Sequence, residues 1–369
     1  MKNRKLLTAV GLAAALALTA CGGDSEASEG LGEREGTDPV TALGGEEAAA
    51  EFESMYAAAV EDGQTTINVY TPLTATWPDV FAAFEERFPE ISVEPLQIVG
   101  AELDTKVTQE QASGQTIADA VITGDTGAVN LADKDFFEPY QPFNAEDISD
   151  DPQFSLETGT LSLVSASPRG FVYDTRQDEI VPESWEDLLD PSLKGKIVMD
   201  EPATDGGGLQ MGDLILNDDE LGRDYLEKLA EQDLTISSNT AECHNMVVQG
   251  RAYVCLMGAM GNYLTLSGEG APVDIVYPIE GGNWATYWYA GIMDGAENAD
   301  AAKLLFAWLN SPEANEVKAE AGHGPVTNAE NVELAFDNPS EVDQLPRPDL
   351  RDVTGRQAES LPILDEIFN

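Results

Sequence analysis

The sequence predicts an α/β fold arranged as two lobes, and three observations support this prediction. Helical and strand signals alternate from Glu46 onward, a pattern typical of α/β domains. This part of the chain has about 320 residues, a length that indicates two lobes rather than one. Short apolar runs between polar or glycine-bearing loops predict strands at residues 67–70, 92–99, 118–123, 196–199, 252–257 and 274–277.

Apolar periodicity and capping residues locate four helices. One is expected over residues 46–61, and the next begins near Trp77 and ends at Pro89. Two later helices have N-terminal signals, a capping box at residues 184–187 and a cap followed by proline at Ser311-Pro312. The helix that ends at Pro89 has four aromatic residues at the 4, 3, 4 spacing of a buried stripe: Trp77, Phe81, Phe84 and Phe88.

Residues 1–20 are predicted to be an export signal. Lys2, Arg4 and Lys5 precede an apolar stretch. This stretch ends at Ala20 and has 15 residues, whereas a membrane-spanning helix needs about 20. Residues 18–23, Leu-Thr-Ala-Cys-Gly-Gly, overlap the end of this stretch and resemble the lipobox of bacterial lipoproteins. The resemblance implies cleavage before Cys21 and lipidation of that cysteine. Because several acyl chains anchor a protein stably, the resemblance places the mature chain on the outer face of a membrane.

The mature chain is expected to be strongly acidic. Removal of residues 1–20 leaves 16 basic and 68 acidic residues and changes the formal charge from −49 to −52. Since a polyanion is bound by exposed Lys and Arg, this charge excludes nucleic acid as a partner. Residues 21–45 are rich in Gly, Ser, Glu and Asp and poor in large apolar residues, which predicts a disordered acidic tether.

The remaining cysteines are Cys243 and Cys255. In an exported chain an even pair can oxidise and persist, which favours a disulfide over two buried thiols. His244 and His323 lack ligand spacing with other Cys or His, so neither a metal nor a cofactor is expected. The sequence has no nucleophile elbow, metalloprotease motif or phosphate loop, and no catalytic residue is predicted.

Four segments occur in a fixed order: INVYTPLTATWPDVFAAFEERFP (67–89), VPESWEDLLDPSLKGKIVMDEP (181–202), VYPIEGGNW (276–284) and AENADAAKLLFAWLNSPEANEVKAEAGHGPV (296–326). Together they resemble the type 2 periplasmic binding proteins, in particular the group of ferric-iron, polyamine, thiamine and phosphonate binders. The first is similar to the group's opening strand, ligand loop and helix. The second is similar to its Trp-Glu-Asp-Leu-Leu-Asp-Pro and Lys-Gly-Lys signature, and the fourth to its late helix pair.

The resemblance implies two α/β lobes joined by crossing segments, with a ligand cleft between the lobes that closes when it is occupied. Closure surrounds a small ligand and excludes water from its polar contacts. We expect the crossings near residues 165–171 and 282–291. The implied division is lobe 1 at residues 46–165 and 284–330, lobe 2 at 166–283, and a C-terminal segment at 331–369 that is assigned to neither lobe.

Loops that follow strands at this cleft supply the candidate ligand-binding residues. Glycines 206 to 208 precede a helical stretch and either present backbone N–H groups to an anion or serve a tight turn. Farther along, Tyr287 and Tyr289 share one strand face and Trp284, Thr286 and Trp288 the other, so only one set can line the cleft unless both are packing residues. The candidates are Tyr70, Thr71, Thr74, Thr123, Asp125, Asp200, Gly206, Gly207, Asn262, Trp284, Tyr287 and Trp288.

Departures from the group restrict the ligand. Ferric binders have adjacent tyrosines after the strand that here is 252–257, where this chain has Met260-Gly261 and a single Tyr263. Polyamine binders have Trp-x-Asp after Glu-Gly-Gly, and here no Asp follows residues 280–282 at that place. Flat aromatic walls favour an organic solute over a bare metal ion, and we expect an amine-bearing or other polar organic ligand.

The resemblance implies a lipid-anchored, extracytoplasmic substrate-binding component of an ABC transporter. Its expected partners are the ABC permease and ATPase subunits, a small-molecule ligand, and the membrane through the lipid anchor, and the protein is expected to be a monomer. The alternatives are a ferric-iron or polyamine binding protein of the same family and a ligand receptor for a sensor kinase.

Overall fold

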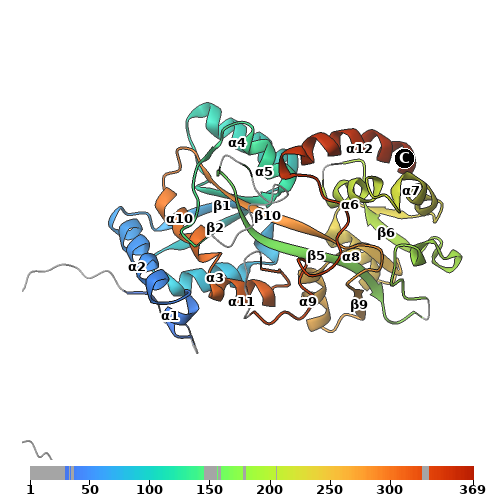
Figure 1. Ribbon diagram of the computed structural model, residues 1–369, viewed down its shortest axis with the longest axis horizontal. Helices are drawn as coiled ribbons and strands as arrows, with labels where there is room; N and C mark the ends of the chain where they lie inside the picture. Colours follow the sequence, from blue (N-terminus) through green and yellow to red (C-terminus); the bar gives the residue numbers. More distant parts are fainter. Residues whose placement is uncertain are drawn as a thin grey trace, which may run out of the picture.

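The computed structural model describes residues 30–32, 34, 37–144, 156, 159–177, 180–204, 206–325 and 332–369. Two lobes lie side by side in Figure 1, one with α2, α3, α10 and α11 and the other with α6 to α9. A long strand, β5 (Ser162–Asp174), runs from one lobe into the other. Within the described residues, no helix is both long and apolar enough to cross a membrane.

A single sheet passes through both lobes. Its strands are parallel within each lobe, where β1 pairs with β2 and β3, and β6 pairs with β7 and β8. They are antiparallel in the middle, where β10 pairs with β3 and β5. The order is β2 (Ser92–Gln97), β1 (Thr66–Thr71), β3 (Ala120–Gly124), β10 (Trp284–Met293), β5, β8 (Val254–Ala259), β6 (Ile197–Asp200) and β7 (Thr235–Ser237), with β4 (Phe137–Glu138) beside β10 and β9 (Val273–Val276) beside β5.

The strands predicted from apolar runs are confirmed as β1, β2, β3, β6, β8 and β9. The expected first crossing at residues 165–171 lies within β5, and the expected return at 282–291 overlaps β10. Residues 163–169 of β5 pair with β10, whereas residues 171–174 pair with β9. Strand β5 therefore joins β10, which pairs with the first lobe's β3, to the second lobe's β8 and β9.

Helices cover the two ends of the sheet. The predicted helix at 46–61 is confirmed as α2 (Glu46–Glu61), and the cap at Ser311 is confirmed because its hydroxyl accepts from the amide of Ala314 at 3.2 Å. The other α-helices are α1 (Pro39–Ala42), α3 (Pro78–Arg87), α4 (Gly100–Ser113), α5 (Asp125–Ala132), α6 (Gly207–Leu216), α7 (Gly222–Ala230), α8 (Thr240–Val248), α9 (Met260–Gly268), α10 (Ala299–Trp308), α11 (Pro312–Glu320) and α12 (Val353–Phe368).

Each lobe has its own apolar core. The core of the first lobe contains the predicted aromatic stripe, and Trp77, Phe84 and Phe88 are fully buried there. The core of the second lobe packs around β6 and β8 and contains Trp185, whose Nε1 donates to the carbonyl of Gly282 at 2.8 Å. The burial of these side chains confirms the stripe prediction. An amphipathic helix is stable when its apolar face packs against a neighbour.

The capping box at residues 184–187 is present, but the expected α-helix is not. The Ser184 hydroxyl accepts from the amide of Asp187 at 3.1 Å, and the Asp187 carboxylate accepts from the amide of Ser184 at 3.0 Å. A 3₁₀ turn at residues 187–189 follows instead, and a second at residues 191–193 comes after it. Pro191 ends the first of these turns, because a proline forces the preceding residue out of the helical region, and Asp190 is extended with ψ 129°.

The predicted disordered tether is wrong for residues 37–45. The short helix α1 is capped by Asp38, whose carboxylate accepts from the amide of Thr41 at 3.0 Å, and Leu43 is buried in the first lobe's core. Farther upstream, the amide of Gly32 donates to the carbonyl of Arg87 at 2.9 Å. The average composition of the segment concealed its few apolar and basic residues, which make these contacts.

A buried cluster of charges fixes this N-terminal segment to the first lobe. Arg87 and Glu313 form a two-point ion pair, at 3.1 Å through Nε and 2.8 Å through Nη2, and both side chains are almost fully buried. Arg34 donates to the same carboxylate at 3.0 Å, and Trp308 donates to it through Nε1 at 3.0 Å. The carboxylate therefore receives several donors, which is the condition for a buried charge to be tolerated.

Removal of Arg87 is expected to destabilise the protein strongly. Arg87→Met leaves the buried Glu313 carboxylate with fewer donors, and breaking such a pair from one side costs about 3 to 5 kcal/mol in the free energy of unfolding. Urea unfolding followed by circular dichroism measures the loss. Arg223→Met, which breaks an exposed pair with Glu227, is the matched control and is expected to change the unfolding midpoint little. Equal losses in the two variants would contradict the assignment.

Candidate functional site

Arg169 lies at the junction of the lobes, on β5 and opposite Trp284 of β10. Its Nε and Nη2 donate to the Thr286 hydroxyl at 3.2 and 2.9 Å, and its Nη1 donates to the carbonyl of Met257 at 3.4 Å. The guanidinium lies 5.4 Å from the centre of the Trp284 ring. The crossing strands thus place a cation where loops from both lobes meet.

This guanidinium is buried and, among the described residues, has no carboxylate within ion-pair distance. Burial lowers the pKa of Arg169 to about 10, and the charge of Asp200 opposes that shift. The side chain therefore remains a cation at neutral pH. A buried cation whose direct partners are neutral is costly unless another group supplies negative charge.

A chain of hydrogen bonds joins the two lobes beside Arg169. The Thr286 hydroxyl donates to Oε1 of Gln210, on α6, at 3.2 Å. Nε2 of Gln210 donates to Oδ2 of Asp125, the first residue of α5, at 3.0 Å. Since α5 belongs to the first lobe and α6 to the second, the structure is closed at this point by the protein's own side chains.

Arg347 reaches the same carboxylate from the C-terminal segment. Its Nη2 lies 3.0 Å from Oδ2 of Asp125 and 3.4 Å from the hydroxyl of Tyr289. Its guanidinium lies over the ring of Tyr287, 4.4 Å from the centroid. The Asp125 carboxylate thus contacts the side-chain amide of Gln210 from the second lobe and the guanidinium of Arg347 from the C-terminal segment.

Asp200 and the start of α6 border the junction of the lobes on the side of the second lobe, and we call this part of the site the second-lobe wall. The Asp200 carboxylate accepts from the hydroxyls of Ser237 and Thr240, each at 2.8 Å, and burial raises its pKa. Gly206 adopts φ +148°, and a Cβ on Gly208 would lie 2.5 Å from the carbonyl oxygen of Glu201. These two glycines are therefore required by the tight turn itself.

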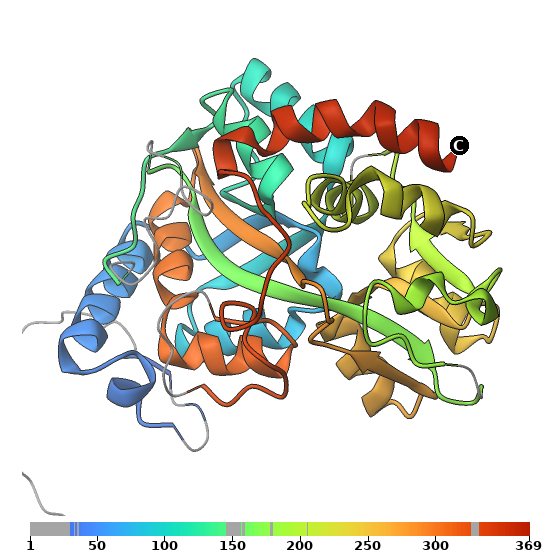
Figure 2. The ribbon, with the colours of Figure 1, turned by 45° about the vertical axis from the view of Figure 1, so that its right-hand side comes forward.

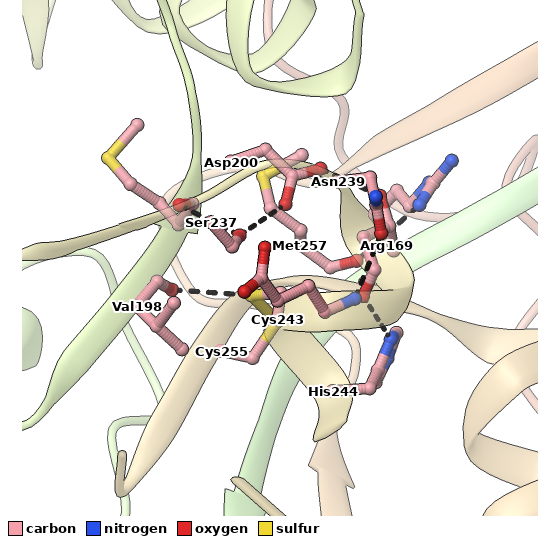
Figure 3. Close-up of a disulfide and its surroundings, with 12 residues drawn as sticks. Arg169, Val198, Asp200, Ser237, Asn239, Cys243, His244, Cys255 and Met257 are labelled. Atoms are coloured by element: carbon pink, nitrogen blue, oxygen red, sulfur yellow. Dashed lines mark hydrogen bonds between the residues drawn. A yellow bond between two sulfur atoms is a disulfide. The ribbon is translucent and has the colours of Figure 1, made fainter. Parts of the chain in front are cut away.

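The predicted disulfide between Cys243 and Cys255 is confirmed, with a Cα separation of 5.6 Å. It joins α8 to β8, and Figure 3 shows Arg169, Asp200 and His244 around it. The first residue of α8 is Thr240, which binds Asp200, while Met257 of β8 accepts from Arg169. The crosslink therefore ties together the two elements that position this wall.

His244 lies within this wall as a neutral side chain. Its Nδ1 is 2.8 Å from the carbonyl of Thr240, and burial lowers its pKa to about 4, with the charge of Arg169 acting in the same direction. Nε2 has no hydrogen-bond partner among the described residues. Within the same part of the chain, no group of three His, Cys, Asp or Glu side chains is arranged to hold a metal ion.

The structure brings together some of the predicted site residues and separates others. Asp125, Trp284 and Tyr287 contact Arg169 or Arg347 directly. Asp200 interacts with the charge of Arg169, Gly206 and Gly207 form the start of α6, and Thr123 is the penultimate residue of β3, two positions before Asp125. Residues outside this network are Tyr70, Thr71, Thr74, Asn262 and Trp288.

Four of the candidates outside this network make contacts within the first lobe. The Tyr70 hydroxyl donates to Glu110 at 2.7 Å inside the first lobe, and the Thr71 hydroxyl accepts from the amide of Leu73 at 3.2 Å. Thr74 contacts Gln97, and Trp288 packs against the first lobe's core. A place at the end of a strand is therefore insufficient to identify a contact between lobes.

Sequence reasoning missed Arg169, Gln210 and Arg347. The sequence did contain a signal for Arg169, since it is the one basic residue between Ser162 and Asp174. The structure shows that this stretch, Arg169 included, is almost entirely buried. The sequence contained no such signal for Arg347, because only the fold shows that the C-terminal segment reaches Asp125.

Comparisons with known proteins agree with this architecture. The family described as "Bacterial extracellular solute-binding protein" matches residues 70–316. An uncharacterised protein of Haemophilus influenzae is 29% identical over 170 residues, 42% of this chain and 46% of its own length. A putative 2-aminoethylphosphonate-binding periplasmic protein of Salmonella typhimurium is 27% identical over 161 residues, 42% and 48% of the two chains. The chain thus spans about half the length of these curated relatives.

Solved structures share the fold at low identity. Iron-bound HitA from Pseudomonas aeruginosa has a TM-score of 0.65 at 19% identity, over 82% of this chain and 99% of its own. AfuA from Actinobacillus pleuropneumoniae, with fructose 6-phosphate bound, has 0.66 at 20%, over 82% and 98%. These are two-lobed type 2 periplasmic binding proteins, which confirms the predicted fold class. Because the family match covers more than half of the sequence, the chain belongs to the bacterial extracellular solute-binding protein family.

Proposed function

We propose that the protein is the lipid-anchored, extracytoplasmic substrate-binding component of an ABC importer, and that it captures a small polar organic solute with an anionic group between its lobes. The role as a binding component, rather than an enzyme, is supported by the family match. The ABC permease and ATPase subunits are the partners that such a role requires. The ligand class is supported above all by Arg169.

Arg169 supplies a positive charge that the described protein does not neutralise by direct contact. Among the described residues, its hydrogen-bond acceptors are the hydroxyl of Thr286 and the carbonyl of Met257, both neutral. A planar guanidinium binds a carboxylate, phosphate or phosphonate with two parallel hydrogen bonds. An anionic group at this place would offset the cost of burying the cation.

The start of α6 adds a second attraction for an anion. The cap residue Gly206 has no side chain, so the first backbone N–H groups of the helix receive no capping hydrogen bond from it. Such N–H groups and the positive end of the helix dipole favour negative charge. A Cβ on Gly207 would lie 2.9 Å from the terminal methyl group of Met257, and the backbone carbonyl of Met257 accepts from Arg169, so both attractions border the same residue of β8.

Names of similar proteins agree with this ligand class. The Salmonella typhimurium relative is described as binding 2-aminoethylphosphonate, and the solved structure of AfuA contains fructose 6-phosphate. Both solutes are small organic molecules with an anionic phosphorus group. HitA is described as iron-bound, and another structure of the same fold is a thiamin binding protein. The fold alone therefore leaves several solutes to compare, and Arg169 supports those that carry an anionic group.

Calorimetry against a panel of solutes tests the proposal. The panel is 2-aminoethylphosphonate, fructose 6-phosphate, thiamine, spermidine and ferric iron. We expect an anionic organic solute to bind most tightly. Arg169→Met should weaken that solute at least tenfold, which is about 1.4 kcal/mol, because it removes the charge that faces the anion.

Arg176→Met is the control for this experiment. Arg176 lies just beyond the same strand and pairs with Asp174 instead of facing the junction of the lobes, so its substitution should leave affinity unchanged. The proposed ligand class would be refuted if ferric iron or spermidine bound tightly and with the same affinity before and after the Arg169→Met substitution.

The membrane anchor rests on Cys21, which lies outside the described residues. Cys21→Ala is expected to move the protein from the membrane fraction to soluble or unprocessed forms, because the acyl chains have no attachment point. Fractionation and labelling with radioactive palmitate measure this change, and Ser25→Ala is the neighbouring control. If Cys21→Ala still incorporates lipid at its N-terminus, the anchor is assigned to the wrong residue.

A further inference from the structure

The C-terminal segment, residues 332–369, crosses the junction of the two lobes. It first runs beside the start of β10, where the amide of Leu345 donates to the carbonyl of Asn283 at 2.8 Å and the amide of Asn283 donates to the carbonyl of Asp343 at 2.8 Å. Leu345 is buried in the second lobe's core. Figure 2 shows the segment rising over the crossing strands before it forms α12.

Helix α12 then contacts both lobes. At its start, Val353 packs in a cluster with Val129 of α5, and the Thr126 hydroxyl donates to Oε1 of Gln357 at 2.9 Å. Arg356, one residue before Gln357, pairs with Asp213 of α6 at 2.6 Å. In Figure 2 the helix spans from α5 to α7. The segment is therefore attached on both sides of the position where Arg347 enters.

Arg347 takes up a geometry that proteins use to hold cationic ligands. Its guanidinium lies over the face of Tyr287 at 4.4 Å and makes a 3.0 Å ion pair with Asp125, and only 8% of its side chain is exposed. A cation above an aromatic ring and against a carboxylate is stabilised by both. An amine-bearing solute would require the same ring and the same carboxylate.

We propose that Arg347 is a specificity-determining residue: an intramolecular cation that fills the subsite formed by Asp125, Tyr287 and Tyr289 and thereby excludes cationic solutes from it. The inference rests on the proposed function, because it takes the junction of the lobes as the place where solutes bind. The segment on either side holds the cation in place, through Leu345 before it and α12 after it.

Removal of the Arg347 side chain should turn this subsite into a binding site for a free cation. Arg347→Ala leaves Asp125 buried with Gln210 and its own neighbour Thr126 as donors, and it opens a space the size of the lost side chain. Ethylguanidinium has the same atoms as the arginine side chain beyond Cβ. It therefore fits the vacated volume, the face of Tyr287 and the carboxylate.

Calorimetry and thermal unfolding of the mature protein with ethylguanidinium test the inference. We expect Arg347→Ala to bind the ion at least tenfold more tightly than the unsubstituted protein does, and the ion to raise the melting temperature of the variant alone. Arg356→Ala is the matched control, since Arg356 belongs to the same segment and also pairs with a buried carboxylate but lies over no aromatic ring of the described residues. Its gain in ethylguanidinium binding should be smaller.

The double variant Asp125→Asn, Arg347→Ala locates the binding. It should lose the affinity for ethylguanidinium, because the carboxylate is gone while the cavity remains. If Arg347→Ala folds poorly, the yield of folded protein with and without ethylguanidinium replaces calorimetry, and a higher yield with the ion supports the proposal. Equal binding to Arg347→Ala and the unsubstituted protein, no gain in yield, or unchanged binding to the double variant would overturn it. Ethylguanidinium lacks an anionic group, so none of these outcomes depends on Arg169.

Discussion

The antiparallel pairing of β5 with β10 is the interaction on which the rest of the structure depends. Both strands enter both cores, since Val164 and Ala290 are buried in the first lobe and Phe171 and Trp284 in the second. The ladder fixes which residues face each other, and a slip of one residue would turn every side chain to the opposite face. Arg169 meets Thr286 because this register holds, and the loops of both lobes assemble around that pair.

Much of the fold could be predicted because its signals are local. Short apolar runs bounded by turns locate strands, and the aromatic stripe of α3 identifies a buried helix face, since both patterns depend on residues a few positions apart. The disulfide needed only an even cysteine pair in an exported chain. The prediction of a helix after Ser184 was wrong for an equally local reason, since Pro191 ends the 3₁₀ turn.

The candidate site could be predicted only in part because its contacts join distant residues. Asp125 was predicted from its place after a strand and Tyr287 from the aromatic run at the return crossing, but their partners Gln210 and Arg347 come from other parts of the chain. Tyr70 shows the converse, since its position resembles that of a ligand contact while its hydroxyl is engaged by Glu110. Strand position determines where a backbone lies, whereas the long-range packing of side chains determines what they contact.

The docking of Gly32 and Arg34 on the first lobe would limit the distance between the folded body and a bilayer if Cys21 carries the proposed lipid. With a lipid on Cys21, as proposed, a fully extended chain allows at most about 40 Å between Cys21 and Gly32, at about 3.6 Å per residue. Gly32 is bonded to Arg87 at the end of α3. A lipid on Cys21 would therefore keep the part of the first lobe around the end of α3 within this distance of the membrane. A body restrained in this way presents a limited range of orientations to a membrane-embedded partner.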